Sequence, residues 1–346
     1  MTFILRSSTI LLQVLLIFGI WASQAYCRTF PDADVNVMVK RHDQWMASHG
    51  RAYKDHAEKK KRFKIFKDNV KFIESFNIGG NQPYSLRINE FADLTNEEFL
   101  ALRNGYNFQS SNLMSSSKAS FKYYNVTAVP SSMDWRKKGA VTPVRDQGNC
   151  GCCWAFSAVA ATEGVTKLKT GKLVSLSEQQ LVDCDTRSAG CSGGLMDYAF
   201  QFIIRNKGLA AEADYPYEGV DGSCVRNKEE PPAAKITGYE VVPENEEALL
   251  KAVANQPVSV AIDSSGVAMQ FYSSGVFTGQ CGSQLDHGVT AVGYGTSDDG
   301  TKFWLVKNSW GRSWGEDEYI RIQRDVNVKG GLCGITEQAS YPTVDL

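Results

Sequence analysis

Nine cysteines in 346 residues constrain this chain more than any other feature, because that number is high for a cytosolic enzyme. The N-terminus indicates the compartment: Arg6 precedes an apolar run over residues 14–22, and small residues follow up to Ala25. This pattern predicts a secretory signal peptide over residues 1–27. The alternative, a membrane anchor, is disfavoured because the run is short for a bilayer. Secretion would place the cysteines in an oxidising lumen, where disulfides form.

The two parts of the chain differ in charge. Residues 1–128 hold 17 Lys and Arg against 11 Asp and Glu, a net charge of +6, and residues 129–346 hold 20 against 27, a net charge of −7. Opposite charges predict that the two segments dock on each other. The net charge of the whole chain is only −1, so no basic excess indicates nucleic-acid binding.

The spacing of apolar residues predicts helices over much of residues 35–105. Between residues 58 and 77 large apolar side chains recur three or four apart, and Glu58 and Arg62 are spaced to form an i, i+4 pair. Thr95 begins a capping box for another short helix. Residues 110–120 are rich in Ser and Asn, which predicts an exposed linker.

Later segments are first helical and then rich in strands. Helices are expected over residues 153–169, ended by Gly171, and over residues 194–206. Strands are expected over residues 235–242, 257–263, 287–294, 303–308 and 319–323, with one short helix over residues 246–255. A helical half followed by a β-rich half predicts an α+β protein with two packed lobes.

One cysteine is placed to act as a nucleophile. Cys153 opens the first of these helices, where the positive end of the helix dipole favours the reactive thiolate. An imidazole is a suitable partner, and His287 is the only one of four histidines in the later half. Asn308 ends a predicted strand and is placed to accept a hydrogen bond from the ring of His287. The spacing of cysteines and histidine fits no standard zinc pattern, so we expect no metal and no cofactor.

These blocks resemble the signatures of papain-like cysteine proteases. Residues 147–154 resemble the block around the catalytic cysteine, and residues 285–288 and 307–311 resemble the histidine and asparagine blocks. His287 and Asn308 follow Cys153 by 134 and 155 residues, against about 130–150 in the family. The longer separation is explained by a surface insertion.

The resemblance extends into the first part of the chain. A helical propeptide motif is matched by Glu58, Arg62, Phe66, Asn69, Ile73 and Asn77, and a second motif by Asn89, Phe91 and Asp93. Arg87 stands where the second motif usually has a small residue. The resemblance implies a signal peptide at 1–27, an inhibitory propeptide at 28–128 and a mature peptidase at 129–346. It also implies a papain-like two-lobe α+β fold, with a helical lobe at about 138–239 and an antiparallel, β-barrel-like lobe at about 240–340.

Residue roles follow from the same resemblance. Cys153 is expected to be the nucleophile, His287 the acid and base, Asn308 the residue that orients His287, and Gln147 a donor to the oxyanion. Substrate contacts are expected from Gly193, Gly194, Leu195, Met196, Ala261, Leu285, Gln338 and Trp310, the last also covering the hydrogen bond between Asn308 and His287. The apolar pocket with a neutral floor predicts Leu, Phe or Val, rather than Arg, at the second residue before the cut.

The cysteines divide into three groups. Cys27 leaves with the signal peptide or lies at its edge, Cys152 and Cys153 stay free, and six remain, which allow 15 pairings. The resemblance selects Cys150–Cys191, Cys184–Cys224 and Cys281–Cys333. Cys152 stands where the family usually has Ser or Ala. It is either a small buried filler or a redox partner for an oxidised Cys153.

The expected function is that of a cysteine endopeptidase, made as a secretory-pathway zymogen and activated near pH 4–5, that degrades proteins in a vacuole, in a lysosome or outside the cell. A peptide ligase on the same scaffold and a non-catalytic storage or binding protein are the alternatives. Expected partners are protein and peptide substrates, the chain's own propeptide as inhibitor and cystatin-type inhibitors, with no nucleic acid and no membrane anchor. The enzyme is expected to be a monomer, and Asn125 begins a glycosylation sequon.

Overall fold

The computed structural model describes residues 32–80, 82–106, 121–225 and 231–345. The expected signal peptide with Cys27, and the expected linker at 110–120, lie outside the described residues. The chain divides into two units, Met1–Lys67 and Asp68–Leu346, which are described separately. No helix in the described part of the chain is both long and apolar enough to cross a membrane.

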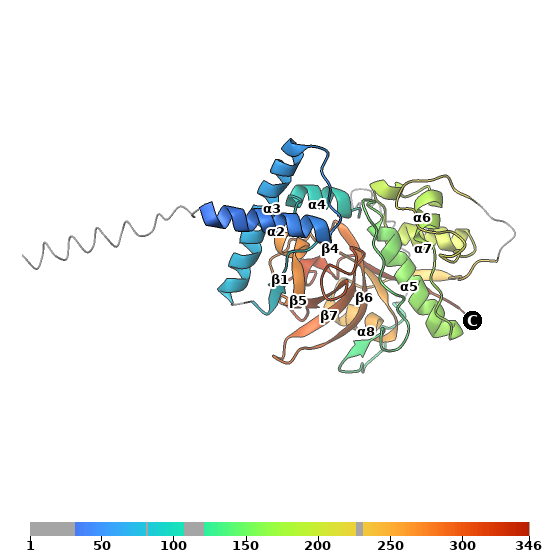
Figure 1. Cartoon of the computed structure of the whole chain (residues 1–346). Coiled ribbons are helices and arrows are strands. Elements are labelled where there is room, and N and C mark those ends of the chain that lie inside the picture. The colour runs from blue at the N-terminus through green and yellow to red at the C-terminus, as the bar shows by residue number, and fades with distance from the viewer. Residues whose placement is uncertain (1–31, 81, 107–120, 226–230, 346) are drawn as a thin grey trace, which may run out of the picture. The chain divides into compact units, whose positions relative to one another are not determined.

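The first unit holds α2 (Asp32–Ser48) and the first half of α3 (His56–Gly79), drawn in blue in Figure 1. Aromatic rings fill the space between the two helices. The ring of His42 lies 5.9 Å from that of Trp45 and 4.9 Å from that of Phe66. The expected helical pair is present, with Arg62 Nε 2.7 Å from a carboxylate oxygen of Glu58.

In the second unit, two asparagines of the helical motif fasten α3 to the following chain. The side-chain amide of Asn69 donates to the carbonyls of Ala92 and Leu94, both at 2.9 Å. Asn77 donates to the carbonyl of Leu86 at 2.8 Å and accepts its N–H at 3.0 Å. These amides satisfy backbone groups that a connecting segment would otherwise leave unpaired.

The capping box expected at Thr95 is confirmed. It opens α4 (Asn96–Arg103), where the Thr95 side chain accepts the N–H of Glu98 and the Glu98 side chain accepts the N–H of Thr95. Just upstream, β1 (Tyr84–Leu86) pairs antiparallel with β5 (Tyr272–Phe277). The segment before residue 107 therefore adds an edge strand to a sheet formed by the later chain.

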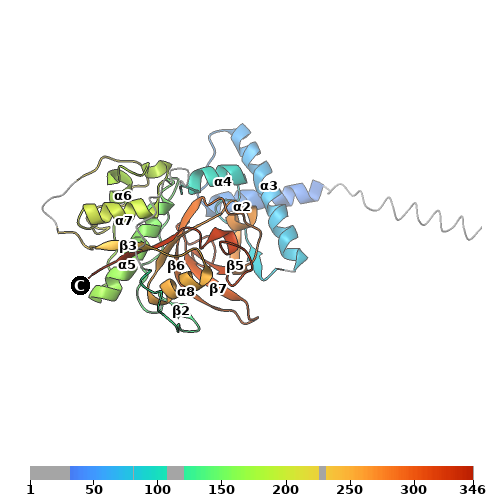
Figure 2. The same ribbon diagram turned by 180° about the vertical axis from the view of Figure 1, so that it is seen from behind.

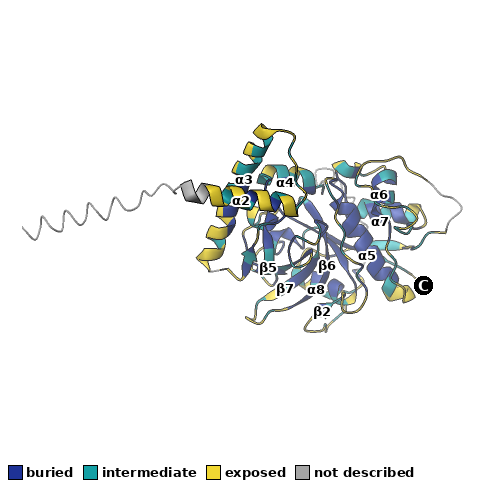
Figure 3. Cartoon of the chain, in the orientation of Figure 1, coloured by how far each residue is buried: buried dark blue, intermediate teal, exposed yellow. Residues whose placement is uncertain are grey.

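Three helices form the first lobe of the later chain and lie together beside the sheet in Figures 1 and 2: α5 (Cys153–Thr170), α6 (Glu178–Cys184) and α7 (Met196–Arg205). Residues 153–166 of α5 are all buried, as its dark blue colour in Figure 3 shows. The helix ends as expected at Gly171, whose φ of 75° gives a left-handed cap. The buried helix thus presents its first residue, Cys153, at a fixed place.

The second lobe is a sheet whose strands run in the order β1-β5-β8-β7-β6-β4-β9-β3, with β2 paired to β6. All pairs are antiparallel except β5 with β8. The remaining strands are β2 (Met133–Asp134), β3 (Gly238–Val241), β4 (Val258–Ile262), β6 (His287–Thr296), β7 (Lys302–Lys307), β8 (Tyr319–Gln323) and β9 (Ala339–Thr343). Two short helices, α8 (Glu246–Asn255) and α9 (Val267–Gln270), complete the lobe. The α+β fold class is confirmed.

Three disulfides are present, and each lies within one lobe. Cys150–Cys191 and Cys184–Cys224 lie in the helical lobe, and Cys281–Cys333 lies in the sheet lobe. These are the pairs that the resemblance implied. They close segments of 41, 40 and 52 residues, so each is expected to contribute about 2–4 kcal/mol to the free energy of unfolding.

Candidate active site

Cys153 lies at the N-terminus of α5, held by the loop before it. The Cys150–Cys191 disulfide and the hydrogen bond from Gly151 N–H to the carbonyl of Cys191, 2.9 Å long, fix this loop. The Cys153 side chain is completely buried, and its Sγ accepts the N–H of Gly288 at 3.3 Å. Burial raises the pKa of the thiol to about 12, although the N–H groups of Gly288 and Gly105 act in the opposite direction.

His287 begins β6, where it pairs with Ile262 of β4. Its Nε2 lies 2.7 Å from Asn308 Oδ1, and the ring of Trp310 stacks on it at 4.5 Å. Because the amide oxygen can only accept, Nε2 carries the proton and Nδ1 is left with a lone pair. Among the described residues Nδ1 has no hydrogen-bond partner. Cys153 Sγ is bound by the residue that directly follows His287, so sulfur and imidazole belong to one site.

Two effects keep His287 neutral in this precursor. Burial and the positive charge of Arg103 together lower the pKa of the imidazole to about 4, although the hydrogen bond to Asn308 acts in the opposite direction. Both shifts favour the un-ionised pair, a thiol beside a neutral imidazole. The nucleophilic thiolate is therefore disfavoured in the structure as it stands.

Asn308 follows the last residue of β7 and continues its pairing with β8. Its N–H donates to the carbonyl of Glu318 at 3.0 Å, and its Oδ1 also accepts the N–H of Ser309 at 2.8 Å. The side-chain oxygen is thus held in place by a main-chain contact on one side while it accepts from His287 on the other. This explains why the amide points its oxygen, and not its nitrogen, at the imidazole.

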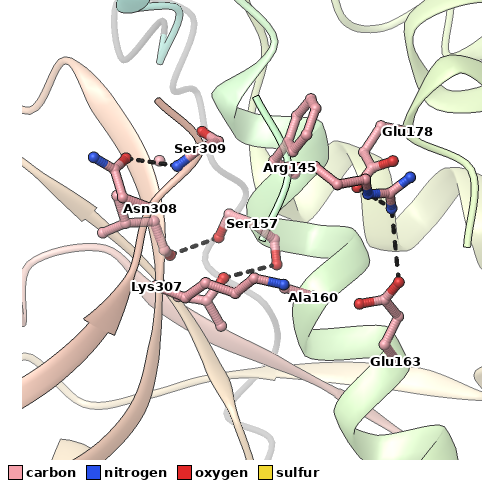
Figure 4. Close-up of a pocket in the computed structure, with 12 residues that line it drawn as sticks. Arg145, Ser157, Ala160, Glu163, Glu178, Lys307, Asn308 and Ser309 are labelled. Atoms are coloured by element: carbon pink, nitrogen blue, oxygen red, sulfur yellow. Dashed lines mark hydrogen bonds and ion pairs between the residues drawn. The ribbon is translucent and has the colours of Figure 1, made fainter. Parts of the chain in front are cut away.

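Behind Asn308, a buried polar cluster links the two lobes around a cavity of about 10 Å³ (Figure 4). Lys307 Nζ donates to the hydroxyl of Thr142 at 3.0 Å, and that hydroxyl donates to Glu163 of α5 at 2.6 Å. Arg145 pairs with Glu178 at 2.5 Å. Burial raises the pKa of Glu163 and lowers that of Lys307, but each is opposed by the charge of the other. The cluster ties β7 to the helix that carries Cys153.

The amide of Gln147 is fully occupied. Its Oε1 accepts the hydroxyl of Ser309 at 2.7 Å, and its Nε2 donates to the carbonyls of Cys150 and Arg103, both at 2.9 Å. Arg103 is the last residue of α4, and its guanidinium lies 2.6 Å from a carboxylate oxygen of Asp146. The carbonyl of Arg103 therefore occupies the Gln147 amide, which was expected to donate to the oxyanion.

Residues 104–106 run directly over the cysteine. The carbonyl of Gly105 accepts the N–H of Gly194 at 2.9 Å, and the N–H of Tyr106 donates to the carbonyl of Asp286 at 3.1 Å. The bridge between Tyr106 and Gly194 is parallel. A Cβ on Gly105 would lie 1.7 Å from the carbonyl oxygen of Gly151, so only glycine fits there. This segment closes the site by direct contact.

Tyr106 is buried beside residues that were expected to contact the substrate. A cavity of about 10 Å³ remains beside it. The expected wall residues Leu195 and Met196 and the expected floor residue Gln338 line this cavity. Ala261 and Leu285 are buried in the hydrophobic core that also contains Cys153.

Sequence reasoning missed several residues of this site. Asp197, at the start of α7, lines the pocket and accepts the hydroxyl of Ser340 at 2.6 Å. Gly105 and Arg103 cover the cysteine and the histidine, yet neither belongs to a chemical motif. The one sequence signal for Asp197 was its position directly after Met196, which had already been assigned to the pocket.

Cys152 faces away from the site. Its Sγ lies 3.0 Å from the hydroxyl of Tyr217, in the core of the helical lobe, and burial raises the pKa of its thiol. Tyr217 in turn donates to the carbonyl of Gln147 at 2.6 Å. This environment favours the interpretation of Cys152 as a buried filler. Over the residues that the structure describes, no group of three or more His, Cys, Asp or Glu is arranged to hold a metal ion.

Comparison with known proteins places these residues in context. Residues 129–343 match the family described as papain family cysteine protease, and residues 42–99 match the cathepsin propeptide inhibitor domain, I29. The chain is 54% identical over 341 residues to the senescence-specific cysteine protease SAG12 of Arabidopsis thaliana, which covers 96% of this chain and 99% of that protein. It is also 54% identical over 316 residues to SAG39 of Oryza sativa subsp. japonica, covering 90% of this chain and 92% of that protein.

Two solved precursors have a similar fold. A recombinant stem bromelain precursor has 47% identity and a TM-score of 0.82, and the match covers 89% of this chain and 99% of that one. The proform of Amb a 11, a cysteine protease and ragweed pollen allergen, has 45% identity and a TM-score of 0.85, and the match covers 92% of this chain and 99% of that one.

Proposed function

The chain belongs to the papain family of cysteine proteases and is a zymogen with an inhibitory propeptide, and from this premise we propose which residues perform its endopeptidase reaction. Cys153 is the nucleophile, His287 the acid and base, Asn308 the residue that orients the imidazole, and Gln147 a donor to the oxyanion. The observation that carries this proposal is the geometry around His287. Its Nε2 is bonded to Asn308 at 2.7 Å, and the next residue binds Cys153 Sγ.

The reaction follows from these positions once the propeptide has left. The Cys153 thiolate attacks the peptide carbonyl, and the oxyanion is stabilised by the Gln147 amide and the N–H of Cys153. His287, whose Nδ1 has taken the proton of the Cys153 thiol, then gives that proton to the leaving amine, and a thioester remains on Cys153. Water activated by His287 hydrolyses the thioester and regenerates the thiol. Trp310 covers the bond between His287 and Asn308 and keeps water from competing for it.

The test is mass spectrometry of the acid-matured protein after treatment with an active-site-directed epoxide. We expect one label, on Cys153, complete loss of peptidase activity, and a new N-terminus near residue 129. The Cys153→Ala variant should take no label and show no activity, and the Cys152→Ser variant should keep both. Labelling of Cys152 in place of Cys153 would overturn the assignment of the nucleophile.

Substrates are proposed to be protein segments in extended conformation. The backbone of Gly193 and Gly194 is expected to pair with the substrate main chain, because the Gly194 N–H already binds a peptide carbonyl in the precursor. Leu195 and Met196 wall the pocket for the second residue before the cut, and Gln338 forms its neutral floor, with Ala261 and Leu285 behind them. A peptide library should therefore show Leu, Phe or Val at this position, and a preference for Arg would refute the assignment.

Activation is proposed to occur near pH 4–5, where ordinary carboxylates become protonated. The charges of the propeptide and the mature enzyme are opposite, and the ion pair of Arg103 with Asp146 at 2.6 Å is one such contact beside the site. Protonation of the acidic partners weakens this pairing. A precursor that matures equally fast at pH 7 would contradict the proposal.

The remaining assignments concern processing and location. We assign the signal peptide to residues 1–27, the propeptide to 28–128 and the mature enzyme to 129–346. The family matches at 42–99 and 129–343 support the last two assignments. Asn125 is exposed and available for glycosylation. The enzyme is a secretory-pathway protease, and we propose a vacuole, a lysosome or the extracellular space as its destination and cystatin-type proteins as external inhibitors. Product analysis with an added amine would reveal any peptide ligation.

A further inference from the structure

Two consecutive residues before β8 have an unusual backbone conformation. Asp317 and Glu318 have φ angles of 52° and 74°, a left-handed region that residues other than glycine seldom occupy. Such strain persists only where the surrounding structure fixes it. The two side chains differ, because Asp317 is exposed whereas Glu318 is completely buried. The buried member is the one that contacts the active site.

Glu318 binds both ends of one short segment. Its main-chain carbonyl accepts the N–H of Asn308 at 3.0 Å, and its carboxyl Oε1 accepts the N–H of Gly311 at 2.7 Å. Its own N–H donates to the carbonyl of Trp314 at 2.8 Å, which fixes the residue itself. The left-handed backbone is what allows one residue to turn both its carbonyl and its side chain toward the same segment.

That segment, residues 308–311, carries two groups that touch His287. Asn308 holds Nε2 at 2.7 Å, and the ring of Trp310 stacks on the imidazole at 4.5 Å with an angle of 25° between the planes. A shift at either end of the segment would move both groups relative to the imidazole. No other side-chain hydrogen bond to the N–H of Gly311 is found within the described residues.

We propose that Glu318 is a positioning residue for the peptidase reaction, acting by clamping residues 308–311 so that Asn308 and Trp310 hold His287 in its working orientation. This inference rests on the roles proposed above for His287 and Asn308. Glu318 touches neither the substrate nor the reacting atoms, so it acts only through the segment that it binds.

The contact to Gly311 requires an acceptor oxygen but not a negative charge. Burial, supported by the acidic groups of Asp146 and Glu90, raises the pKa of Glu318 to about 8, although the N–H of Gly311 and the charge of Lys307 act in the opposite direction. Burial therefore favours the protonated carboxyl. Gln has the same shape and retains an acceptor oxygen, which makes Glu318→Gln the conservative variant.

The experiment compares the acid-matured enzyme with three variants on a short fluorogenic peptide, with active sites counted by titration with an epoxide. Glu318→Gly removes the carboxyl contact to Gly311 and relieves the backbone strain, while the main-chain carbonyl that accepts the Asn308 N–H remains. With one end of the segment released, we expect kcat to fall about 10-fold or more with KM changed less than about 2-fold. Glu318→Gln should stay within about 2-fold of the unsubstituted enzyme. Asp317→Gly is the matched control: it relieves the same kind of strain without touching the clamp, so kcat should not change.

A second measurement does not depend on maturation. In the full-length precursor carrying Cys153→Ala, nitrogen NMR of the His287 ring should show the Nε2-protonated form, and Glu318→Gly should produce a mixture of tautomers while Glu318→Gln does not. Unchanged kcat and tautomer in Glu318→Gly would overturn the inference, as would a Gln variant as slow as the Gly variant. Neither result would affect the proposed function, which fails only if Cys153 is not the labelled residue.

Discussion

Gly105 offers the sharpest test of how the propeptide silences the enzyme. Replacing it by alanine adds one methyl group where the structure has no room: the new Cβ would lie 1.7 Å from the carbonyl oxygen of Gly151. An ordinary carbon–oxygen contact is about 3.3 Å or longer. The obstacle is main chain and cannot rotate away, so residues 104–106 must move by about 1.5 Å.

A displacement of that size breaks the hydrogen bonds that seat the segment. The bond from Gly194 N–H to Gly105 O is 2.9 Å long and that from Tyr106 N–H to Asp286 O is 3.1 Å, and neither survives an added 1.5 Å or so. Each such bond contributes about 0.5–1.5 kcal/mol, so closure is weakened by roughly 1–3 kcal/mol. The open form of the precursor should therefore become about 5- to 150-fold more populated.

The assay is the initial rate at which an epoxide labels Cys153 in the intact precursor at pH 7, followed by mass spectrometry. Labelling requires the cleft to open, so Gly105→Ala should be labelled about 5- to 150-fold faster than the unsubstituted precursor. Gly79→Ala is a suitable control, because a Cβ at that position in α3 meets nothing within 4 Å. Equal labelling rates for Gly105→Ala and the unsubstituted precursor would refute the steric argument.

Three further predictions concern the site itself. Asn308→Ala removes the acceptor of the His287 proton, and kcat of the matured enzyme should fall about 10- to 100-fold in peptide hydrolysis assays, with KM little changed. In the inactive precursor, the raised pKa of Glu318 means that the folded state holds the proton of this carboxyl more tightly than the unfolded chain does. The resulting stabilisation of the folded state is complete below about pH 4.5 and is lost as the pH rises to about 8. Melting curves should therefore show Glu318→Gln losing less stability over that range, by up to roughly 4 kcal/mol, and parallel curves would contradict this. Cys152→Ser should recover from peroxide at the normal rate, because its sulfur faces Tyr217, and slower recovery would restore the redox hypothesis.

Much of the fold follows from local signals in the sequence. The helix that begins at Cys153 and ends at Gly171 has a start, an apolar body and a stop residue, and α8 and β8 have the predicted bounds. The strands β1, β2, β5 and β9 were not predicted, and β1 lies within residues 35–105, where helices were expected. β5 contains Ser273, Ser274 and Gly275, which are weak strand formers, and it owes its conformation to pairing with β1 and β8. Such pairing is tertiary and leaves no local pattern.

Some residues of the candidate site could likewise be predicted from the sequence, and others could not. Cys153, His287 and Asn308 stand in blocks with distinctive neighbours, so a resemblance could indicate them before any coordinates. Glu318 and Gly105 stand in no such block. Their importance comes from backbone geometry, a left-handed φ in one case and a contact with Gly151 in the other, and neither property can be read from residue type.

The propeptide acts on the site in more than one physical way, and the parts reinforce each other. Gly105 excludes a substrate main chain by contact, and the carbonyl of Arg103 occupies the Gln147 amide. The same cover removes water from Cys153 and His287, which shifts their pKa values toward the thiol and the neutral imidazole, and the Arg103 charge adds to the shift at His287. Departure of residues 103–106 therefore uncovers the cleft, frees the Gln147 amide that we propose as an oxyanion donor, and favours ionisation of the pair in one event. A propeptide that only obstructed the cleft would leave the ionisation of Cys153 unchanged, whereas burial under this cover also favours the thiol over the nucleophilic thiolate.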